Sequence, residues 1–428
     1  MPIPHVLVIP YPAQGHVIPI MELTQRLAKH RVRVTCINTE VNHKLVTSNC
    51  LDKDGLGDLV QMVSIPDGLE PWEDRSDIRK LTLSILQTMP RKLEELIETI
   101  NKEDSSKVTC IIADGFMGWA IRVAKKMGIS SAAFWPASVA TLASFLSFQK
   151  LIDDGIINKN GIPLSDEMIQ LSETMPPIKP QNLAWACFED SALVEVIFKM
   201  AAAFSLYPQL LPIGPLLASN RLAVQAGHFW QEDSTCLAWL DQQPVSSVIY
   251  VAFGSFTMFN QTQFEELAHG LELSNRPFLW VVRPGMTKET TTDYPEGYIE
   301  RIGSRGKILS WAPQQKVLSH PSVACFMSHC GWNSTLEGVT NGVPFLCWPY
   351  FADQFHNETY ICDIWKNGLG LEKDEVGIIT RGEIMSKAEK LLSDKTFKVK
   401  ASYIKEKVTS KGGCSHKNLN NFIMDTKE

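Results

Sequence analysis

The chain has 428 residues, of which 44% are hydrophobic and 21% charged, a composition that excludes wholesale disorder. The 26 glycines and 24 prolines are too few and too scattered for a fibrous or low-complexity protein. Lysine and arginine total 41 against 47 acidic residues, giving a net charge of −6 without a basic run, which argues against a nucleic-acid-binding surface. At roughly 150 residues per domain, this length predicts two or three domains.

The ten cysteines contain no C-x-x-C pair, so their spacing predicts neither a zinc ribbon nor a disulfide framework. Reduced thiols in a cytosolic enzyme are the simpler interpretation. The first residues, MPIPHVLVIPYPAQGH, lack a basic region, and their apolar run is too short and too interrupted by proline for a signal peptide. No apolar segment approaches the ~20 residues that a membrane span needs. We expect a cytoplasmic, monomeric protein without a membrane span.

The first half of the chain alternates β-rich apolar runs with helical periodicity. Strands are expected at His5–Ile9, Val32–Ile37, Leu59–Ile65, Val108–Ala113 and Ser131–Trp135. Helices are expected from Val17 to Leu27 and at Ile78–Ile100, Phe116–Lys126 and Ser138–Lys150. This alternation predicts a parallel sheet covered on both faces, with ligands bound at the carboxyl ends of the strands.

A less regular, proline-rich stretch leads to a polar segment at 214–243, which we interpret as an interdomain linker. The alternation then restarts, with strands at Val248–Phe253, Phe278–Val282, Lys307–Leu309, Val323–Met327 and Phe345–Cys347. Helices are expected at Gln263–Leu273, Gln315–Ser319, Ser334–Asn341, Phe355–Asn367, Arg381–Leu392, Lys398–Val408 and Lys417–Thr426. The pattern predicts two α/β units in tandem.

The nucleotide-binding motifs that glycine spacing usually reveals are absent. No G-x-x-x-x-G-K-[ST] occurs, and no G-x-G-x-x-G follows the first strand, which argues against a P-loop enzyme and against a nicotinamide or flavin enzyme. Instead SHCGWNSTLE, which includes His329, follows an apolar strand and opens a helix. Gly331 permits a tight turn, and Asn333 or Ser334 can serve as the N-cap. Such a helix start suits a phosphate, but a plain strand–turn–helix has the same pattern.

The most specific signal is the stretch from Trp311 to Gln354, which reads WAPQQKVLSHPSVACFMSHCGWNSTLEGVTNGVPFLCWPYFADQ. It resembles the signature box of plant UDP-sugar-dependent glycosyltransferases of secondary metabolism. The resemblance continues at PYPAQGH, NTE, IIADGF, LPIGPL, VIYVAFGS and GGCSHKNLNNFI, and so extends over nearly the whole chain. It implies the α/β fold called GT-B, in which two Rossmann-like, doubly wound parallel-sheet domains face each other across a cleft.

The resemblance also implies which part of the chain binds each substrate. Residues 1–213 would form the acceptor-binding domain and residues 244–410 the UDP-sugar-binding domain. Residues 214–243 would link them, and residues 411–428 would form a helix that packs back on the first domain. UDP-glucose would be a co-substrate, and neither a cofactor nor a metal would be required.

By position in the box, Trp311 would stack on uracil and the backbone of Ala312 would address the edge of the base. Gln314 and Glu337 would hold the ribose hydroxyls, a sensible role for an acidic side chain facing a diol. The diphosphate would be bound by His329, Asn333, Ser334 and Ser255, and the sugar by Trp332, Asp353 and Gln354. Trp311 as a core residue and Asp353 as a helix cap are the alternative interpretations. In the family, glutamine at the end of the box accompanies glucose.

His16 lies in the loop after the first strand, and Asp114 ends another apolar strand of the same sheet, so their side chains can converge. A neutral imidazole can accept a hydroxyl proton, and a carboxylate on its far nitrogen fixes the tautomer. A lone histidine in such a loop is usually only solvated, but the resemblance implies that His16 is the base and Asp114 its orienting partner. Acceptor contacts are expected from four residues for which ordinary core is the alternative: Phe116, Met117, Trp135 and Trp185.

The implied reaction is inverting transfer of glucose from UDP-glucose to a hydroxyl of a small lipophilic acceptor, a flavonoid or another phenolic, to give a β-O-glucoside. A weakly active or inactive UDP-sugar-binding relative is the second hypothesis. A nucleotide-sugar epimerase of similar fold is a third, which the box disfavours.

The second hypothesis comes from departures from the family pattern. Members carry a further strand before the LPIGPL segment, whereas here Val196–Met200 runs almost directly into Ala201–Tyr207. We therefore expect the first domain to lack one strand, which would expose a sheet edge and remove part of the core. The segment around Thr409–Lys411 is also short, and Arg31 replaces the glycine that tends to follow the first helix, at a position suited to a left-handed cap.

Overall fold

The chain divides into two compact units in the computed structural model, which describes residues 3–49, 58–103, 107–188, 191–201, 209–216, 229–287, 294–410 and 413–426. Unit 1 consists of Met1–Leu171, Trp185–Trp230 and Lys411–Glu428. Unit 2 consists of Ser172–Ala184 and Gln231–Ser410. Helix α8 (Thr235–Leu240) lies inside the range 214–243 that the sequence pattern indicated as linker.

Unit 1 is built on a parallel sheet in the order β3-β2-β1-β4-β5. Its strands are β1 (His5–Ile9), β2 (Arg33–Thr39), β3 (Val60–Ile65), β4 (Val108–Asp114) and β5 (Ser130–Phe134). Val8 of β1 lies opposite Cys36 of β2 and Ile112 of β4. The strand order reverses between β1 and β4, and the carboxyl ends of these two strands therefore border the crevice where ligands of such sheets bind.

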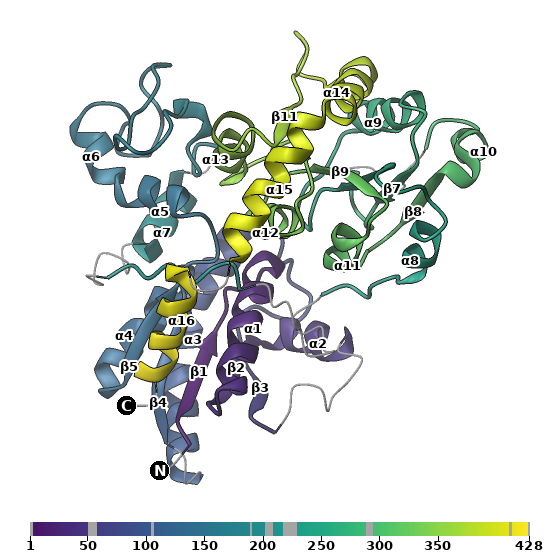
Figure 1. The fold of residues 1–428 in the computed structure, drawn as a ribbon. Helices are drawn as coiled ribbons and strands as arrows, with labels where there is room; N and C mark the ends of the chain where they lie inside the picture. Colours follow the sequence, from purple (N-terminus) through teal and green to yellow (C-terminus); the bar gives the residue numbers. More distant parts are fainter. Residues whose placement is uncertain are drawn as a thin grey trace. The chain divides into compact units, whose positions relative to one another are not determined.

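Helices cover both faces of this sheet (Figure 1). On one face, α1 (Gln14–Lys29) and α16 (Cys414–Asp425) pack on β1 and β4. On the other face lie α3 (Ile78–Glu103) and α4 (Gly118–Met127). The unit also contains α2 (Glu40–Asn49), α5 (Val139–Leu146), α6 (Phe148–Asp153) and α7 (Ser191–Ala201). The single helix predicted for 138–150 is thus two helices that meet at Ser147.

The end of α1 has the left-handed residue that the sequence predicted. Arg31 has φ of 62°, a conformation that glycine adopts without the steric cost a side chain pays. Its backbone N–H donates to the carbonyl of Ala28, 2.9 Å away, and so closes the last turn. Arginine is therefore tolerated here, at a cost of about 1 kcal/mol relative to glycine.

In the part of unit 1 that the structure describes, no strand follows β5. The stretch expected to lack a strand begins at the end of α7, and its residues 202–207 lie outside the described residues. Lys411, in the second shortened segment, lies outside them as well. The expected loss of a strand therefore stays a prediction.

Unit 2 is built on a second parallel sheet, in the order β11-β10-β9-β6-β7-β8. The strands are β6 (Val248–Ala252), β7 (Phe278–Val281), β8 (Gly306–Leu309), β9 (Val323–Ser328), β10 (Phe345–Cys347) and β11 (Gly368–Gly370). Val251 of β6 lies opposite Trp280 of β7 and Met327 of β9. The order reverses between β6 and β9, so the loops after these two strands border the second crevice.

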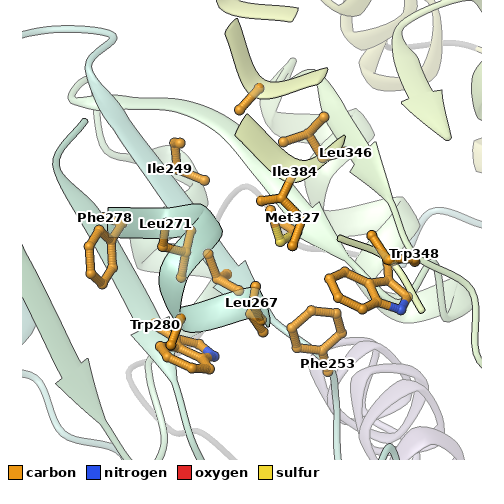
Figure 2. Packing of buried hydrophobic residues seen from close by; sticks show 14 of the residues in the cluster. Ile249, Phe253, Leu267, Leu271, Phe278, Trp280, Met327, Leu346, Trp348 and Ile384 are labelled. Carbon is orange, nitrogen blue, oxygen red and sulfur yellow. The ribbon is translucent and has the colours of Figure 1, made fainter. Parts of the chain in front are cut away.

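Alternate residues of these strands point into two separate cores. One core lies under α9 (Gln261–Leu273), α10 (Tyr298–Ile302) and α14 (Arg381–Ser393), and Figure 2 shows Leu267 and Leu271 of α9 packed among Trp280, Phe253 and Ile384. The other core lies under α8, α11 (Gln314–Ser319) and α12 (Trp332–Asn341). The remaining helical segments are α13 (Gln354–Thr359), a π-helical turn (Tyr360–Ile364) and α15 (Lys395–Thr409). Two doubly wound sheets confirm the predicted fold class.

Among helices formed by the described residues, none combines the length and the apolar character that crossing a membrane requires.

Candidate active site

The sheet of unit 1 brings His16 and Asp114 together. His16 lies in the first turn of α1, directly after β1, and Asp114 is the last residue of β4. Nδ1 of His16 lies 2.8 Å from Oδ2 of Asp114. An ionised carboxylate only accepts hydrogen bonds, so Nδ1 is the donor and Nε2 keeps its lone pair. This is the arrangement that lets an imidazole accept a proton.

Burial and a backbone contact fix the carboxylate of Asp114. The Asp114 side chain is fully buried, whereas 23% of the His16 side chain is exposed. The other carboxylate oxygen of Asp114 accepts from the backbone N–H of Phe116, 2.9 Å away. Asp114 is therefore held on both oxygens, while the histidine remains accessible to a substrate.

A group of aromatic rings lies next to His16. The ring centroids of Tyr11 and Phe116 lie 5.2 Å and 5.5 Å from that of His16. The group continues from Phe116 to Trp135 at 5.6 Å and from Trp135 to Phe145 at 5.8 Å. These rings offer apolar surface beside His16.

The four expected acceptor residues fall into two pairs. Phe116 and Trp135 are partly exposed and lie in this aromatic group. Met117 is fully buried in the core between the sheet, α3 and α4. Trp185 is 1% exposed, and its indole N–H donates to the carbonyl of Gly161 at 3.0 Å. Phe116 and Trp135 therefore have surface to offer a ligand, whereas Met117 and Trp185 have almost none.

In unit 2, the loops after β6 and β9 meet around the His329 ring. A Cβ placed on Gly254, whose φ is 68°, would lie 2.6 Å from Nε2 of His329. A Cβ placed on Gly331 would lie 2.5 Å from the same atom. Both positions therefore need glycine for the ring to stay where it is. Ser255 follows Gly254 and so belongs to the same crevice.

His329 is neutral at physiological pH. Burial lowers the pKa of its imidazole to about 4, and an interaction with the backbone of Ala252 raises it less. A neutral imidazole still offers one N–H donor to an anion but adds no positive charge. Any charge stabilisation at this crevice therefore has to come from hydrogen bonds and from the helix that follows.

That helix begins earlier than the sequence predicted. α12 starts at Trp332 with Gly331 as its N-cap, so the expectation that Asn333 or Ser334 caps it was wrong. Glycine supplies no capping side chain, and Asn333 and Ser334 lie in the first turn. The close approach of Gly331 to the His329 ring explains why glycine occupies the cap. The first-turn N–H groups and the helix dipole together form a site that favours an anion.

Gln314 and Glu337 belong to one hydrogen-bonded network. Nε2 of Gln314 donates to Oε2 of Glu337 at 2.7 Å and to Oγ of Ser334 at 2.8 Å. Nε2 of Gln315 donates to the other carboxylate oxygen of Glu337 at 2.8 Å. The hydroxyl of Tyr250 donates to Oε1 of Gln314 at 3.0 Å. Ser334 and Glu337 are 7% and 8% exposed, whereas Gln314 and Gln315 are partly exposed, so the network is buried on the Ser334 and Glu337 side.

Asp353 and Gln354 are tied to neighbouring loops. Oδ2 of Asp353 accepts from Nδ2 of Asn357 at 2.8 Å, and the same nitrogen donates to the carbonyl of Cys330 at 2.9 Å. Asn357 thus connects Asp353 with the turn before α12. Oε1 of Gln354 accepts from the backbone N–H groups of Tyr350 and Phe351. Asp353 stands at the N-cap position of α13 but makes no capping hydrogen bond there.

The remaining box residues lie just before α11 and in the first turn of α12. Trp311 is half-buried against the core under α11 and α12, so it is neither a fully buried core residue nor a free surface ring. Its carbonyl accepts from the backbone N–H of Asp233 at 2.9 Å. Ala312 is 5% exposed. Trp332 and Asn333 are both partly exposed in the first turn of α12.

Within the described ranges, no group of three or more histidine, cysteine, aspartate or glutamate side chains is arranged to hold a metal ion.

Glu358 lies in α13, one helical turn after Gln354. Its carboxyl gives a testable dependence of stability on pH. Burial, with a smaller effect of Asp363, raises the pKa of its carboxyl to about 7, and Lys179 opposes this. The unfolded chain releases this proton near pH 4.5, so the free energy of unfolding falls as the pH rises from 4.5 to 7. Glu358→Gln is expected to stabilise the protein by about 1–3 kcal/mol at pH 8 and by less than about 1 kcal/mol at pH 5.

The measurement is thermal unfolding of both proteins across this pH range. Glu375→Gln, an exposed site in the same unit, serves as the control and should change stability equally little at both pH values. Burial also lowers the pKa of His329 and of His356 to about 4, which makes the folded protein less stable below pH 6.5. Because the wild type and Glu358→Gln share both histidines, this effect cancels when their stabilities are compared. A gain from Glu358→Gln that is equal at pH 5 and pH 8 would contradict the prediction.

Comparison with known proteins decides the family. Residues 224–406 match the family model described as UDP-glucoronosyl and UDP-glucosyl transferase. The chain is 44% identical to UDP-glycosyltransferase 83A1 of Arabidopsis thaliana, over 98% of this chain and 96% of that protein. The chain belongs to the plant UDP-glycosyltransferases. Linamarin synthase 1 of Manihot esculenta is 33% identical over 99% of this glycosyltransferase and 96% of the relative.

Solved structures agree. The UDP-glucosyltransferase from Polygonum tinctorium, capable of glucosylating indoxyl, superposes with a TM-score of 0.84 at 27% identity, over 100% of this glycosyltransferase and 99% of that chain. Phytolacca americana UGT2, complexed with UDP-2fluoro-glucose and pterostilbene, gives a TM-score of 0.82 at 26% identity, with 99% of each chain covered. UDP-sugars are thus co-substrates of the family to which this chain belongs.

The Arabidopsis alignment also bears on the length of the chain. It spans 456 positions, more than the 428 residues of this glycosyltransferase. The relative therefore contains positions without a counterpart here.

Sequence reasoning missed three residues of the site network: Tyr250, Gln315 and Asn357. Tyr250 lies in the apolar run of β6, where a tyrosine is normally interpreted as a core residue. Its hydrogen-bond partner Gln314 lies 64 positions away in the sequence. A buried tyrosine usually has a hydrogen-bond partner for its hydroxyl, and this tendency alone could have indicated that Tyr250 contacts a polar residue. Gln315 and Asn357 gave no signal in the pattern, because their roles depend on how α11, α12 and α13 are placed within unit 2.

Proposed function

We propose that this protein transfers glucose from UDP-glucose to a hydroxyl of a small lipophilic acceptor, with inversion, and produces a β-O-glucoside. Unit 1 would bind the acceptor and unit 2 the UDP-sugar. The observation that carries the proposal is the His16–Asp114 pair: its 2.8 Å hydrogen bond leaves Nε2 of a partly exposed imidazole ready to accept a proton. A protein that only binds UDP-sugars has no need of such a pair, which favours activity over the second hypothesis.

In the proposed reaction, Nε2 of His16 takes the proton of the acceptor hydroxyl. The oxygen attacks the anomeric carbon of glucose from the face opposite UDP, and the carbon–oxygen bond to the diphosphate breaks, so UDP leaves with the electron pair. Configuration at the carbon inverts. Asp114 stabilises the imidazolium that forms and keeps the ring oriented, since it is held on both oxygens.

The nucleoside is assigned to the α11 side of unit 2. We propose that uracil stacks on the half-buried ring of Trp311 and that its edge meets the backbone of Ala312. Glu337 would accept hydrogen bonds from the ribose hydroxyls, with Gln314 beside it. The support for this role is the network that presents the carboxylate of Glu337 next to the start of α12.

The diphosphate is assigned to the crevice between the loops after β6 and β9. We propose that Ser255, His329, Asn333 and Ser334 donate hydrogen bonds to it, together with the N-terminus of α12. These groups are preorganised around the charge that develops on the leaving UDP. Because His329 is neutral, the helix dipole and the hydrogen bonds would supply this stabilisation.

The sugar is assigned to Trp332, Asp353 and Gln354. We propose glucose as the donor sugar, because glutamine at the end of the box accompanies glucose in the family and because the structural neighbour from Polygonum tinctorium is named a UDP-glucosyltransferase. For the acceptor we propose a flavonoid or another phenol, since Tyr11, Phe116 and Trp135 present aromatic surface beside His16.

The test is incubation of the purified protein with UDP-glucose and a panel of phenols and aliphatic alcohols, in the presence of EDTA. We expect a glucoside whose anomeric proton has the large coupling of a β-linkage, and we expect UDP-galactose to be a poorer donor. UDP binding without product would support the second hypothesis, and an α-glucoside would contradict the mechanism. Inversion at C2 of the sugar of the UDP-glucose, with release of UDP, would support the epimerase hypothesis.

A further inference from the structure

A buried tyrosine lies behind the residues assigned to the nucleotide. Tyr250 of β6 is 1% exposed, and its ring stacks on Phe326 with centroids 5.0 Å apart. Its hydroxyl reaches Oε1 of Gln314 at 3.0 Å. Burial and the nearby charge of Glu337 raise the pKa of Tyr250 well above 10, so the hydroxyl stays protonated and acts as a donor.

The hydrogen bond from Tyr250 sets the orientation of the Gln314 amide. The carboxylate of Glu337 can only accept, so the nitrogen of Gln314 has to face it, and the oxygen has to face Tyr250. In the flipped amide, two oxygens would face each other at the Glu337 end. The tyrosine hydroxyl stabilises the correct orientation because it gives the amide oxygen a hydrogen-bond partner in a partly buried place.

The correct orientation in turn determines what Ser334 and Glu337 present to a ligand. Ser334 accepts from Gln314 and therefore directs its own hydrogen elsewhere, as a donor that suits a phosphate oxygen. Gln314 and Gln315 hold one carboxylate oxygen of Glu337 each. Each such oxygen accepts up to about two hydrogen bonds, so the held carboxylate can also accept from ligand hydroxyls. Linked hydrogen bonds of this kind strengthen one another where they are removed from water.

We propose that Tyr250 and Gln315 are positioning residues of the nucleotide site, which hold Gln314 and Glu337 so that the protein distinguishes a ribonucleotide from a 2′-deoxyribonucleotide. This inference rests on the proposed function and deepens it. Neither residue touches the nucleotide: Tyr250 acts through Gln314, and Gln315 acts through Glu337. The expected signature is a loss of selectivity for the ribose hydroxyl, which a purely structural role would not produce.

The experiment compares binding of UDP and 2′-deoxy-UDP by calorimetry, which needs no acceptor. The wild-type protein should bind UDP about tenfold or more tightly than 2′-deoxy-UDP, the effect of one hydrogen bond between a hydroxyl and a carboxylate. Tyr250→Phe keeps the ring and removes only the hydroxyl, and we expect it to reduce this ratio to about threefold or less. Gln315→Ala should reduce the ratio in the same direction, because it releases the other oxygen of Glu337.

Tyr298→Phe is the matched control. Tyr298 is also 1% exposed and belongs to unit 2, but it packs in the core under α9 and α10, and its hydroxyl has no hydrogen-bond partner among the described residues. It should leave the ratio at the wild-type value.

If the ratio of the affinities for UDP and 2′-deoxy-UDP is the same in Tyr250→Phe as in the wild type, the inference is overturned. The assignment of the nucleotide to this site would then still stand. Equal loss of affinity for both nucleotides would overturn it too, since that result indicates a structural role. A wild-type protein that binds both nucleotides equally would overturn the ribose role of Glu337 and the inference with it. A wild-type protein that binds neither would contradict the proposed function.

Discussion

His16→Ala is expected to lower kcat by about 10²- to 10⁴-fold, the usual contribution of a positioned general base. The structure presents this imidazole on a fully buried carboxylate, with part of the ring exposed. Without it the acceptor hydroxyl has to lose its proton to water. The measurement is the initial rate with UDP-glucose and the best acceptor of the panel, together with the Kd for UDP.

The Kd for UDP should stay the same in His16→Ala, because every proposed nucleotide contact belongs to unit 2. His416→Ala removes an exposed histidine of α16 in the same unit and should leave kcat unchanged. Asp114→Asn should lower kcat as well, because an amide can hold the wrong tautomer of His16. Equal amounts of glucoside from wild type and His16→Ala would rule out His16 as the base.

Gly331→Ala is expected to weaken UDP binding by about 10- to 100-fold, the effect of losing a hydrogen bond to a charged group. The added methyl group would lie 2.5 Å from Nε2 of His329, so the ring has to move away from the start of α12. Because φ of Gly331 is −58°, alanine fits the backbone, and the effect should appear in binding rather than in folding. Calorimetry with UDP and a thermal unfolding curve distinguish the two.

Gly382→Ala is the control for this prediction. Gly382 also lies in the first turn of a helix of unit 2, α14, but a Cβ there would have its nearest neighbour at 3.9 Å. It should bind UDP as the wild type does. If Gly331→Ala also binds UDP normally, the His329 ring is not part of the phosphate site.

Much of this fold was predictable because the signals are local. The strand at His5–Ile9 was predicted to the residue, since an apolar run between a proline and a Pro/Gly loop has clear limits. The convergence of His16 and Asp114 followed from a general property of parallel sheets, whose ligands gather at the carboxyl ends of the strands. No knowledge of side-chain packing was needed for either result.

Other features depend on packing that the sequence pattern does not contain. Asn333 and Ser334 have good capping propensity, but the space around His329 leaves room only for glycine at the cap of α12. Met117 follows Phe116 directly in the chain, yet Met117 is fully buried and Phe116 is partly exposed, because successive side chains of the 3-10 turn that contains them point in different directions. Local propensity was overruled by tertiary contacts in both places.

The position of α16 has a consequence for how this protein is made. Leu419 and Ile423 complete the core on the face of the first sheet that contains Val6 and Val8. A ribosome that synthesises the chain from its N-terminus releases all of unit 2 before these two residues emerge. Until then, the nascent first sheet exposes part of an apolar face to solvent or to a chaperone. Unit 1 is therefore the first to be synthesised and the last to finish folding.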